Sequence, residues 1–341
     1  MARSKESRSA AGMALVEMRV KLANCNGKTS EFRESYAISY APMSKNSWNH
    51  WWPVLAVLGS VTALGLGTSL AKQLFPVIGA QGTSALRVGF AALMLVCIWR
   101  PWRWPLNRQQ AKSLLAFGVA LGCMNLLFYM ALRDIPFGIA VAIEFSGPLA
   151  VAIYYSRRAV DFVWLALAIV GLALILPLGG NSAGLNLSPV GIASAFGAAI
   201  CWALYIVLGR RLGSIPSGQA VSLGLLCAAL VVVPFGVAEA GAKLLTPSIL
   251  LFGLMVAAIS SALPYTLEML ALRRLPPATF GIALATEPAI AAFMGMLLLS
   301  ENLTLTQWSA IGCIMAAAMG SAMTRPTNKT TEPDVAAITS N

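Results

Sequence analysis

Residues 131–161 read ALRDIPFGIAVAIEFSGPLAVAIYYSRRAVD, and residues 271–301 read ALRRLPPATFGIALATEPAIAAFMGMLLLSE. The two stretches align without a gap at a spacing of 140 residues, so that Pro148 falls on Pro288 (288 − 148 = 140). Each begins with Ala-Leu-Arg, turns at a proline and continues as an apolar run of about 20 residues, the length that a membrane-spanning helix needs. The repeat predicts two similar halves organised around this element.

In each copy a proline interrupts the apolar run shortly after an acidic residue. Glu144 lies one helical turn before Pro148, and Glu287 stands directly before Pro288. A proline removes a backbone donor and leaves a carbonyl group unpaired. A charged side chain at membrane depth adds a cost of roughly 2.5–3.5 kcal/mol on insertion scales. We therefore predict that this element forms the core of a transport site.

The composition indicates a polytopic membrane protein. Of the 341 residues, 58% are apolar and 11% are charged, and the mean hydropathy is +0.74, whereas a soluble domain carries about 25% charged residues. The net charge of +11 would suit nucleic acid, but the basic residues lie in the loops between apolar segments. We therefore predict a lipid bilayer, and no nucleic acid, as the partner of the chain.

No motif for catalysis or metal binding is recognisable. The six cysteines lack the spacing of metal ligands, and the one histidine, His50, lies beside Trp51 and Trp52 at the edge of an apolar segment. There is no G-x-S-x-G, no H-E-x-x-H and no phosphate-binding glycine loop. We expect no enzyme activity, no cofactor and no metal. An ion gradient or the gradient of the substrate itself must then supply the energy.

Ten apolar segments are long enough to span a bilayer. Their predicted limits are 52–71, 83–99, 113–132, 137–155, 162–179, 189–208, 218–237, 248–270, 277–299 and 304–323. They group into a first five-helix repeat at 48–180 and a second at 189–324. The predicted fold class is an all-α polytopic membrane protein.

The two ends of the chain are polar. Residues 1–47 are predicted to be a disordered tail without a cleavable signal peptide, and residues 325–341 a second polar tail. Met43 is followed within ten residues by the first span. It could be the true start, so the sequence leaves open whether 1–42 is expressed.

The basic residues of the loops predict the orientation of the ten spans. One side carries only three, Lys72, Arg133 and Lys243. The other side carries thirteen, namely Lys45, Arg100, Arg103, Arg108, Lys112, Arg157, Arg158, Arg210, Arg211, Arg273, Arg274, Arg325 and Lys329. Since loops rich in Lys and Arg stay in the cytoplasm, both termini are predicted to be cytoplasmic.

The same loops indicate that the second half is inverted. Five helices are an odd number, so the second unit must enter the bilayer from the opposite face, and aligned loop residues should differ in charge. Asp134 aligns with Arg274, and the pair Arg157 and Arg158 aligns with two leucines. Inverted repeats are typical of secondary transporters that bind substrate near the midplane, between the halves.

Four charged residues lie inside the predicted spans, and Lys72 lies at the end of the first one. Arg87 could hold the carboxylate of an amino acid or a structural glutamate, since its forked donors suit either. Glu144 and Glu287 could bind a substrate ammonium or carry a coupling proton. Alternatively, they pair with Arg87 or Lys72 and only hold the bundle together. Glu268, one turn after Pro264, could act in binding, in gating or structurally.

Further polar residues could reach a substrate hydroxyl. Asn125 and Tyr129 lie one turn apart in the third span, and Asn125 aligns with Tyr265 in the second half. Such residues more often bond across helices. Three prolines are predicted to break spans, and the backbone groups they free must meet other protein groups or a water-filled cavity: Pro148, Pro264 and Pro288.

The chain resembles the EamA-type drug/metabolite transporter superfamily. The closing run LPPATFGIALATEPAIAAFMGMLLLSENLTLTQW carries the likeness, with Ser300 in the place of a loop glycine. Within that superfamily, GTSLAKQLFP, TSALRVGF and LPYTLEMLAL resemble the amino-acid exporters of the bacterial inner membrane. The likeness covers about 48–324 and leaves out 1–42.

This resemblance implies a function. It implies two inverted five-helix units in the inner membrane and export of L-threonine, L-homoserine and related amino acids by proton exchange. A broader metabolite or drug effluxer, a passive channel and a membrane-embedded enzyme are the alternatives. The sequence leaves the oligomeric state open between a monomer and a homodimer.

Overall fold

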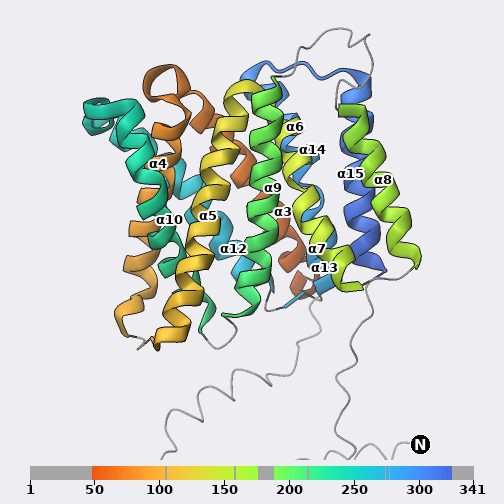
Figure 1. Ribbon diagram of the computed structural model, residues 1–341, viewed down its shortest axis with the longest axis horizontal. Coiled ribbons are helices and arrows are strands. Elements are labelled where there is room, and N and C mark those ends of the chain that lie inside the picture. Colours follow the sequence, from red (N-terminus) through yellow and green to blue (C-terminus); the bar gives the residue numbers. More distant parts are fainter. Residues whose placement is uncertain are drawn as a thin grey trace, which may run out of the picture. The chain divides into compact units, whose positions relative to one another are not determined.

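The computed structural model describes residues 48–103, 106–156, 159–175, 188–212, 215–272, 274–275 and 277–324. This part of the chain is helical, without a strand (Figure 1). The helices belong to a unit that begins at Trp51, except for the first three residues of α3. The predicted tails at 1–47 and 325–341, with the extension 1–42, lie outside the described residues.

The first half of the chain contributes six helices and a short 3-10 turn, η1 (Pro101–Arg103). They are α3 (Trp48–Lys72), α4 (Phe75–Trp99), α5 (Arg108–Asp134), α6 (Phe137–Glu144), α7 (Ser146–Ser156) and α8 (Ala159–Ile175). The second half contributes α9 (Pro189–Arg210), α10 (Ser217–Ala240), η2 (Gly241–Leu245), α11 (Pro247–Ala257), η3 (Ala258–Ala262), α12 (Leu263–Leu272), α13 (Pro277–Leu284), α14 (Glu287–Leu299) and α15 (Leu305–Met323).

Eight helical stretches are long and apolar enough to cross a membrane: 52–72, 75–99, 108–134, 137–155, 189–210, 218–245, 247–268 and 279–299. The other two predicted spans fall on α8, which is apolar but has 17 described residues, and on α15, which has 19. Large apolar side chains such as Leu230 and Leu251 are 70% exposed, as expected for contact with lipid. The structure thus supports eight spanning helices, and the count of ten remains a prediction.

Two spans are broken where the repeated prolines predict it. The first break separates α6 from α7 at Phe145, and the second separates α13 from α14 at Ala285 and Thr286. A shift of 140 residues carries the limits of α6, 137–144, onto those of α13, 277–284. In the third broken span, a π-helical turn, η3, precedes Pro264 and joins α11 to α12.

Two pairs of helices that correspond under the same shift pack against each other. α4 packs on α10 and α8 packs on α15, and these pairs lie side by side in Figure 1. α6 packs on α14, and α5 packs on both α9 and α10. The largest apolar cluster is built around α5, α6, α14 and α15, and its centre includes Ile139, Ile143 and Ala291.

The start of α4 is held by a residue from α10. Gly79 has φ 73° and interrupts the helical geometry of α4, which leaves the backbone donors of the next turn without partners. The Glu239 carboxylate accepts hydrogen bonds from Gln81 N (2.7 Å) and Gly82 N (3.1 Å). This cap fixes the register of the α4 segment that carries Arg87.

Ser300 ends α14 in the left-handed region, with φ 55° and ψ 30°. Glycine adopts this conformation without steric cost, whereas a residue with a Cβ atom does so with strain. The geometry therefore explains why a glycine suits this loop position, as the resemblance noted above implies. The following residue, Glu301, donates its backbone N–H to Gly295 O at 3.2 Å and so closes the turn.

Candidate functional site

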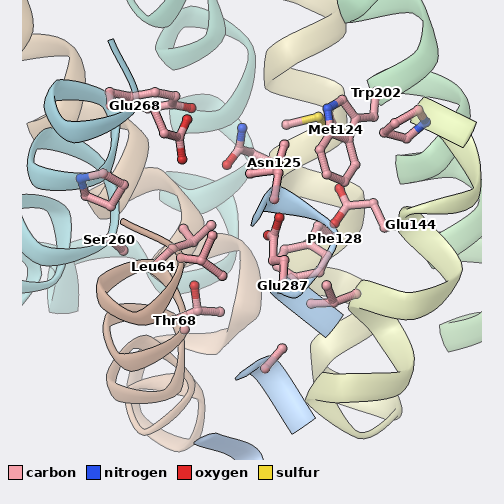
Figure 2. Close-up of a pocket in the computed structure, with 18 of the residues that line it drawn as sticks. Leu64, Thr68, Met124, Asn125, Phe128, Glu144, Trp202, Ser260, Glu268 and Glu287 are labelled. Atoms are coloured by element: carbon pink, nitrogen blue, oxygen red, sulfur yellow. The ribbon is translucent and has the colours of Figure 1, made fainter. Parts of the chain in front are cut away.

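A cavity of about 320 Å³ lies between the two halves of the helical unit. Its lining comes from α3, α4, α5, α6, α7 and α9 and from the broken spans that contain η3 and α14. It brings together eight of the residues singled out in the sequence: Arg87, Asn125, Glu144, Pro148, Pro264, Tyr265, Glu268 and Glu287. Figure 2 shows Glu144 and Glu287 near each other in this cavity, with Glu268 across from them.

Arg87 is the basic group of the cavity. It is 7% exposed, and its guanidinium group donates from Nε to Ser260 Oγ (3.0 Å), from Nη1 to Asn125 Oδ1 (3.0 Å) and from Nη2 to Ser260 O (3.2 Å). Its Cζ lies 5.4 Å from the centre of the Tyr129 ring. Among the described residues, Arg87 forms no ion pair. All three hydrogen-bond acceptors are neutral, so its positive charge is oriented but not neutralised.

The proline in α12 supplies one of these acceptors. In a regular helix the carbonyl of Ser260 would accept from the N–H of residue 264, but Pro264 has no N–H. The carbonyl freed in this way accepts from Arg87 Nη2. The π-helical turn η3 contains Ser260, and such turns are common at functional sites. The helix break and the position of the arginine therefore form one arrangement.

A glycine of α3 lets that helix approach the same turn. A Cβ atom added at Gly67 would lie 2.6 Å from Ser260 Cβ and 2.8 Å from Ser260 N, which is too close for either helix to keep its place. Gly67 thus allows α3 to cover the hydrogen bonds between Arg87 and Ser260.

Glu144 and Glu287 are carboxyl groups without partners. Glu144 is 7% exposed, and Glu287 is partly buried. In the described part of the chain, neither side chain forms a hydrogen bond or an ion pair with Arg87, with Lys72 or with any other residue. The contacts in this structure therefore do not support the alternative that these two acids serve only as structural ion-pair partners.

Glu268 differs from the other two acids because it is hydrogen-bonded. Ser60 Oγ, on α3, lies 2.6 Å from Glu268 Oε1 and 3.3 Å from Pro264 O. Ser60 is fully buried. Its hydroxyl group can donate to the Glu268 carboxylate or to the Pro264 carbonyl. The same serine therefore serves both this acid and the backbone at the third helix break.

The rest of the cavity wall is apolar and aromatic. Met124 and Phe128 come from α5, and Trp202 and Tyr205 come from α9. The Trp202 ring packs edge-on against Phe145, with centroids 5.3 Å apart. Cavities with mostly apolar walls and a few convergent polar groups are typical of sites for small organic ligands.

Three predicted site residues lie outside the cavity wall. Lys72 Nζ lies 2.6 Å from Glu301 Oε1. Tyr129 is fully buried behind Arg87, and Pro288 is buried in the first turn of α14.

Sequence reasoning missed several residues of the cavity and its surroundings. They are Ser60, Thr68, Trp202, Tyr205, Ser260 and Glu301. Only Ser260 carried a local signal, since it stands four residues before a proline and its carbonyl must therefore find another donor. The others come from helices far away in the sequence.

The arrangement offers one guanidinium group and two free carboxyl groups to a single small ligand. Among the described residues there is no cluster of His, Cys, Asp or Glu side chains that could hold a metal ion. Binding of a small zwitterion, and protonation of a carboxyl group, are what these groups can do chemically.

The family model described as "EamA-like transporter family" matches residues 189–323. A solved crystal structure superimposes with a TM-score of 0.51 at 17% identity, over 80% of this chain and 95% of that one. This likeness shows a shared fold and nothing more.

Curated relatives match most of the chain. The threonine/homoserine exporter RhtA of Escherichia coli (strain K12) is 48% identical over 286 residues, which are 84% of this chain and 96% of that protein. The exporter of the same name in Salmonella typhimurium (strain SL1344) is 48% identical over 274 residues, 80% of this chain and 92% of that protein. These relatives are transporters and not enzymes, and the apolar helices mark a multi-pass membrane protein. The chain therefore belongs to the EamA-like transporter family.

Proposed function

We propose that this chain is a secondary transporter that exports small amino acids, L-threonine and L-homoserine above all, across the bacterial inner membrane. One observation carries the proposal: the buried, unneutralised guanidinium group of Arg87 faces the same cavity as two carboxyl groups without partners. A free amino acid presents one carboxylate and one ammonium group, which complement this set. The names of the relatives support the two substrates.

In this mechanism each polar group has a separate task. Arg87 has guanidinium N–H groups left beyond its three hydrogen bonds, and these bind the substrate carboxylate. Glu287 accepts from the substrate ammonium group. Glu144 takes up a proton from outside and releases it inside, so that the inward movement of a proton drives the outward movement of an amino acid.

The proposal extends to ten spanning helices in two inverted repeats, at 48–180 and 189–324. The coincidence of α6 with α13 under the 140-residue shift, and the packing of α4 on α10 and of α8 on α15, support this architecture. The basic loops support cytoplasmic termini. The two halves would then rock around the cavity in alternating access.

The burial pattern supports a cavity that is open toward the cytoplasm. Toward the end that the orientation makes periplasmic, the lining residues Thr68, Phe137 and Ala291 are at most 3% exposed. Trp202 and Tyr205, toward the other end, are partly exposed. A Cβ atom at Gly138 would lie 2.5 Å from Ala292 Cβ, so α6 and α14 cross closely on the buried side.

A broader metabolite or drug effluxer is the second candidate. The aromatic wall of Phe128, Trp202 and Tyr205 favours it, because such a wall tolerates ligands of several shapes. The proposed mechanism uses the residues of one chain, and it is compatible with both a monomer and a homodimer.

The test is efflux of labelled threonine and homoserine from loaded cells with and without this protein, repeated after the proton gradient is collapsed. Expression should raise efflux of both amino acids, and collapse should remove the increase. Arg87→Lys keeps the positive charge but loses the planar set of guanidinium N–H donors that can bind both oxygens of a carboxylate. We expect it to lower efflux roughly 10-fold or more, since hydrogen bonds to charged groups contribute about 1.5–3 kcal/mol each. Unchanged threonine and homoserine efflux, with other compounds becoming toxic on deletion, would favour the broader effluxer.

A further inference from the structure

Thr68 stands out among the threonines in the helix interiors. Thr62, Thr83 and Thr266 each donate their hydroxyl to the carbonyl one turn earlier, at 2.7 Å. This bond is the usual way for a helical threonine to satisfy its hydroxyl group. Thr68 lies well within α3 and has the same option with Leu64 O, yet it forms no such bond in this structure. Its hydroxyl group is therefore directed to partners outside α3, and the Tyr129 phenol lies within reach of it.

The Thr68 side chain lines the cavity. The residue is 2% exposed, and Figure 2 shows its hydroxyl group at the cavity edge, on the side of Glu287. A polar group withdrawn from water costs free energy unless it finds a hydrogen-bond partner. A ligand in the cavity would provide that partner.

A second hydroxyl group lies next to Thr68. The Tyr129 phenol is fully buried, and both the Thr68 hydroxyl and the Arg87 guanidinium group lie within hydrogen-bonding reach of its oxygen. Its oxygen nevertheless forms no hydrogen bond of good geometry. The Thr68 hydroxyl at the cavity wall and the unsatisfied Tyr129 phenol behind it thus lie together at one corner of the cavity, beside the guanidinium group.

The position of this corner suits the chemistry of a hydroxylated amino acid. The Tyr129 ring centre is 5.4 Å from Arg87 Cζ, and Thr68 and Arg87 line the same cavity, so a ligand whose carboxylate binds Arg87 can also reach the Thr68 hydroxyl. In threonine and in homoserine the side-chain hydroxyl is joined to the carboxylate through a short carbon chain. Both ends of such a molecule can be bound at once.

We propose that Thr68 and Tyr129 form a subsite that recognises the side-chain hydroxyl group of the substrate and so sets the preference for hydroxy amino acids. This subsite rests on the proposed function and adds a determinant of specificity to it. The Thr68 hydroxyl, which lines the cavity, donates to or accepts from the substrate hydroxyl, and the Tyr129 phenol behind it orients the Thr68 hydroxyl. An isostere that ends in a methyl group leaves the Thr68 hydroxyl without this partner and is rejected.

The test uses Thr68→Val, which keeps the shape of the side chain and removes the hydroxyl group. Efflux of threonine is compared with efflux of its isostere valine, and efflux of homoserine with that of norvaline. We expect the variant to lower both ratios of hydroxylated to methyl substrate by roughly 3- to 10-fold, the range for one hydrogen bond. Thr68→Ser, which restores the hydroxyl group, should return the ratios toward the wild-type values.

Ser69→Ala is the matched control. Ser69 is the next residue in α3, fully buried and also without a hydrogen-bond partner, but it does not line the cavity. Its substitution should leave both ratios unchanged. If Thr68→Val exports nothing, Tyr129→Phe is used instead, and the same two ratios of hydroxylated to methyl substrate should fall if the subsite exists. Unchanged ratios in every active variant overturn the subsite, whereas a wild-type chain that exports neither threonine nor homoserine overturns the proposed function itself.

Discussion

The two repeated helix breaks place their acids at opposite ends of a helix. Glu144 is the last residue of α6, whereas Glu287 is the first residue of α14. A helix carries partial positive charge at its N-terminus and partial negative charge at its C-terminus, which changes the stability of a nearby charge by about 0.3–1 kcal/mol and by up to ~2 when buried. Two acids that look equivalent in the repeat are thus suited to different tasks.

The helix ends support the division of labour proposed above. α14 stabilises a negative Glu287, as a residue that holds an ammonium group requires. α6 disfavours a negative Glu144, which is also the more buried of the two, so this group is better suited to carry a proton. Single substitutions that remove one charge at a time can separate the two roles.

Glu287→Gln should have the largest effect. It removes the group that faces the substrate ammonium, so both proton-driven efflux and exchange of internal for external threonine should fall. The expected loss is roughly 10- to 100-fold in apparent affinity, the value of one hydrogen bond to a charged group. Threonine counterflow in reconstituted vesicles measures it. Normal exchange in Glu287→Gln would assign the ammonium to another residue.

Glu144→Gln should uncouple transport instead of abolishing binding. We expect efflux from everted vesicles to lose its dependence on the pH gradient. Threonine exchange should stay within about 3-fold of wild type, because Glu144 contributes less than about 1 kcal/mol to the binding of threonine in this mechanism. If coupled efflux continues in this variant, Glu144 is not the proton carrier. If exchange disappears together with coupling, the two acids do not divide their roles.

The N-termini of the two half-helices differ as well. Phe137 N, at the start of α6, donates to Glu301 Oε2 at 2.7 Å, and Lys72 binds the other oxygen of that carboxylate. The corresponding first residue of α13 is Pro277, which has no N–H to satisfy. One half-helix is thus latched to α3 and to the α14–α15 loop, whereas the first residue of the other has no N–H for such a latch to bind.

Glu301→Gln should therefore loosen the α6 end and favour the outward-open state. A contact worth about 1–2 kcal/mol shifts a two-state ratio by a factor of roughly 5–30. With native cysteines replaced and a single cysteine at Ala291, an impermeant thiol reagent added to intact cells should label the variant faster than the parent. Arg133→Gln, which breaks the exposed pair with Asp134, is the control and should label at the parental rate. Equal rates for all three proteins would contradict a latch.

The sequence predicted the breaks of the spans but not which groups they place together. The spans predicted from the 140-residue repeat begin at 137 and 277, where α6 and α13 begin, because proline imposes local constraints that hold in any tertiary context. The contacts of Arg87 could not be predicted, since Ser260 lies 173 residues away and meets it only because Gly67 admits a close crossing of helices. Lys72 illustrates the same limit: its charge was visible, but its partner Glu301 is 229 residues away.

Substitution of Glu268, the acid beside the third helix break, should have the smallest effect. It also serves as the control for the substitutions at the first two breaks. Glu268 also lies within one turn of a helix-breaking proline, in this case after it, and lines the same cavity, but its carboxyl group already accepts from Ser60 Oγ at 2.6 Å. Glutamine keeps an oxygen that accepts the same bond, so Glu268→Gln should retain threonine efflux within about 3-fold, a change below 1 kcal/mol. Its efflux should also keep the dependence on the pH gradient.

This outcome would show that an acid beside a helix break is not enough for coupling. The distinguishing feature would then be the absence of a protein partner, which Glu144 and Glu287 share and Glu268 lacks. If Glu268→Gln removes the pH-gradient dependence while Glu144→Gln retains it, the proton moves through the hydrogen-bonded acid on α12. In that case the ends of α6 and α14 would shape the binding of the amino acid alone.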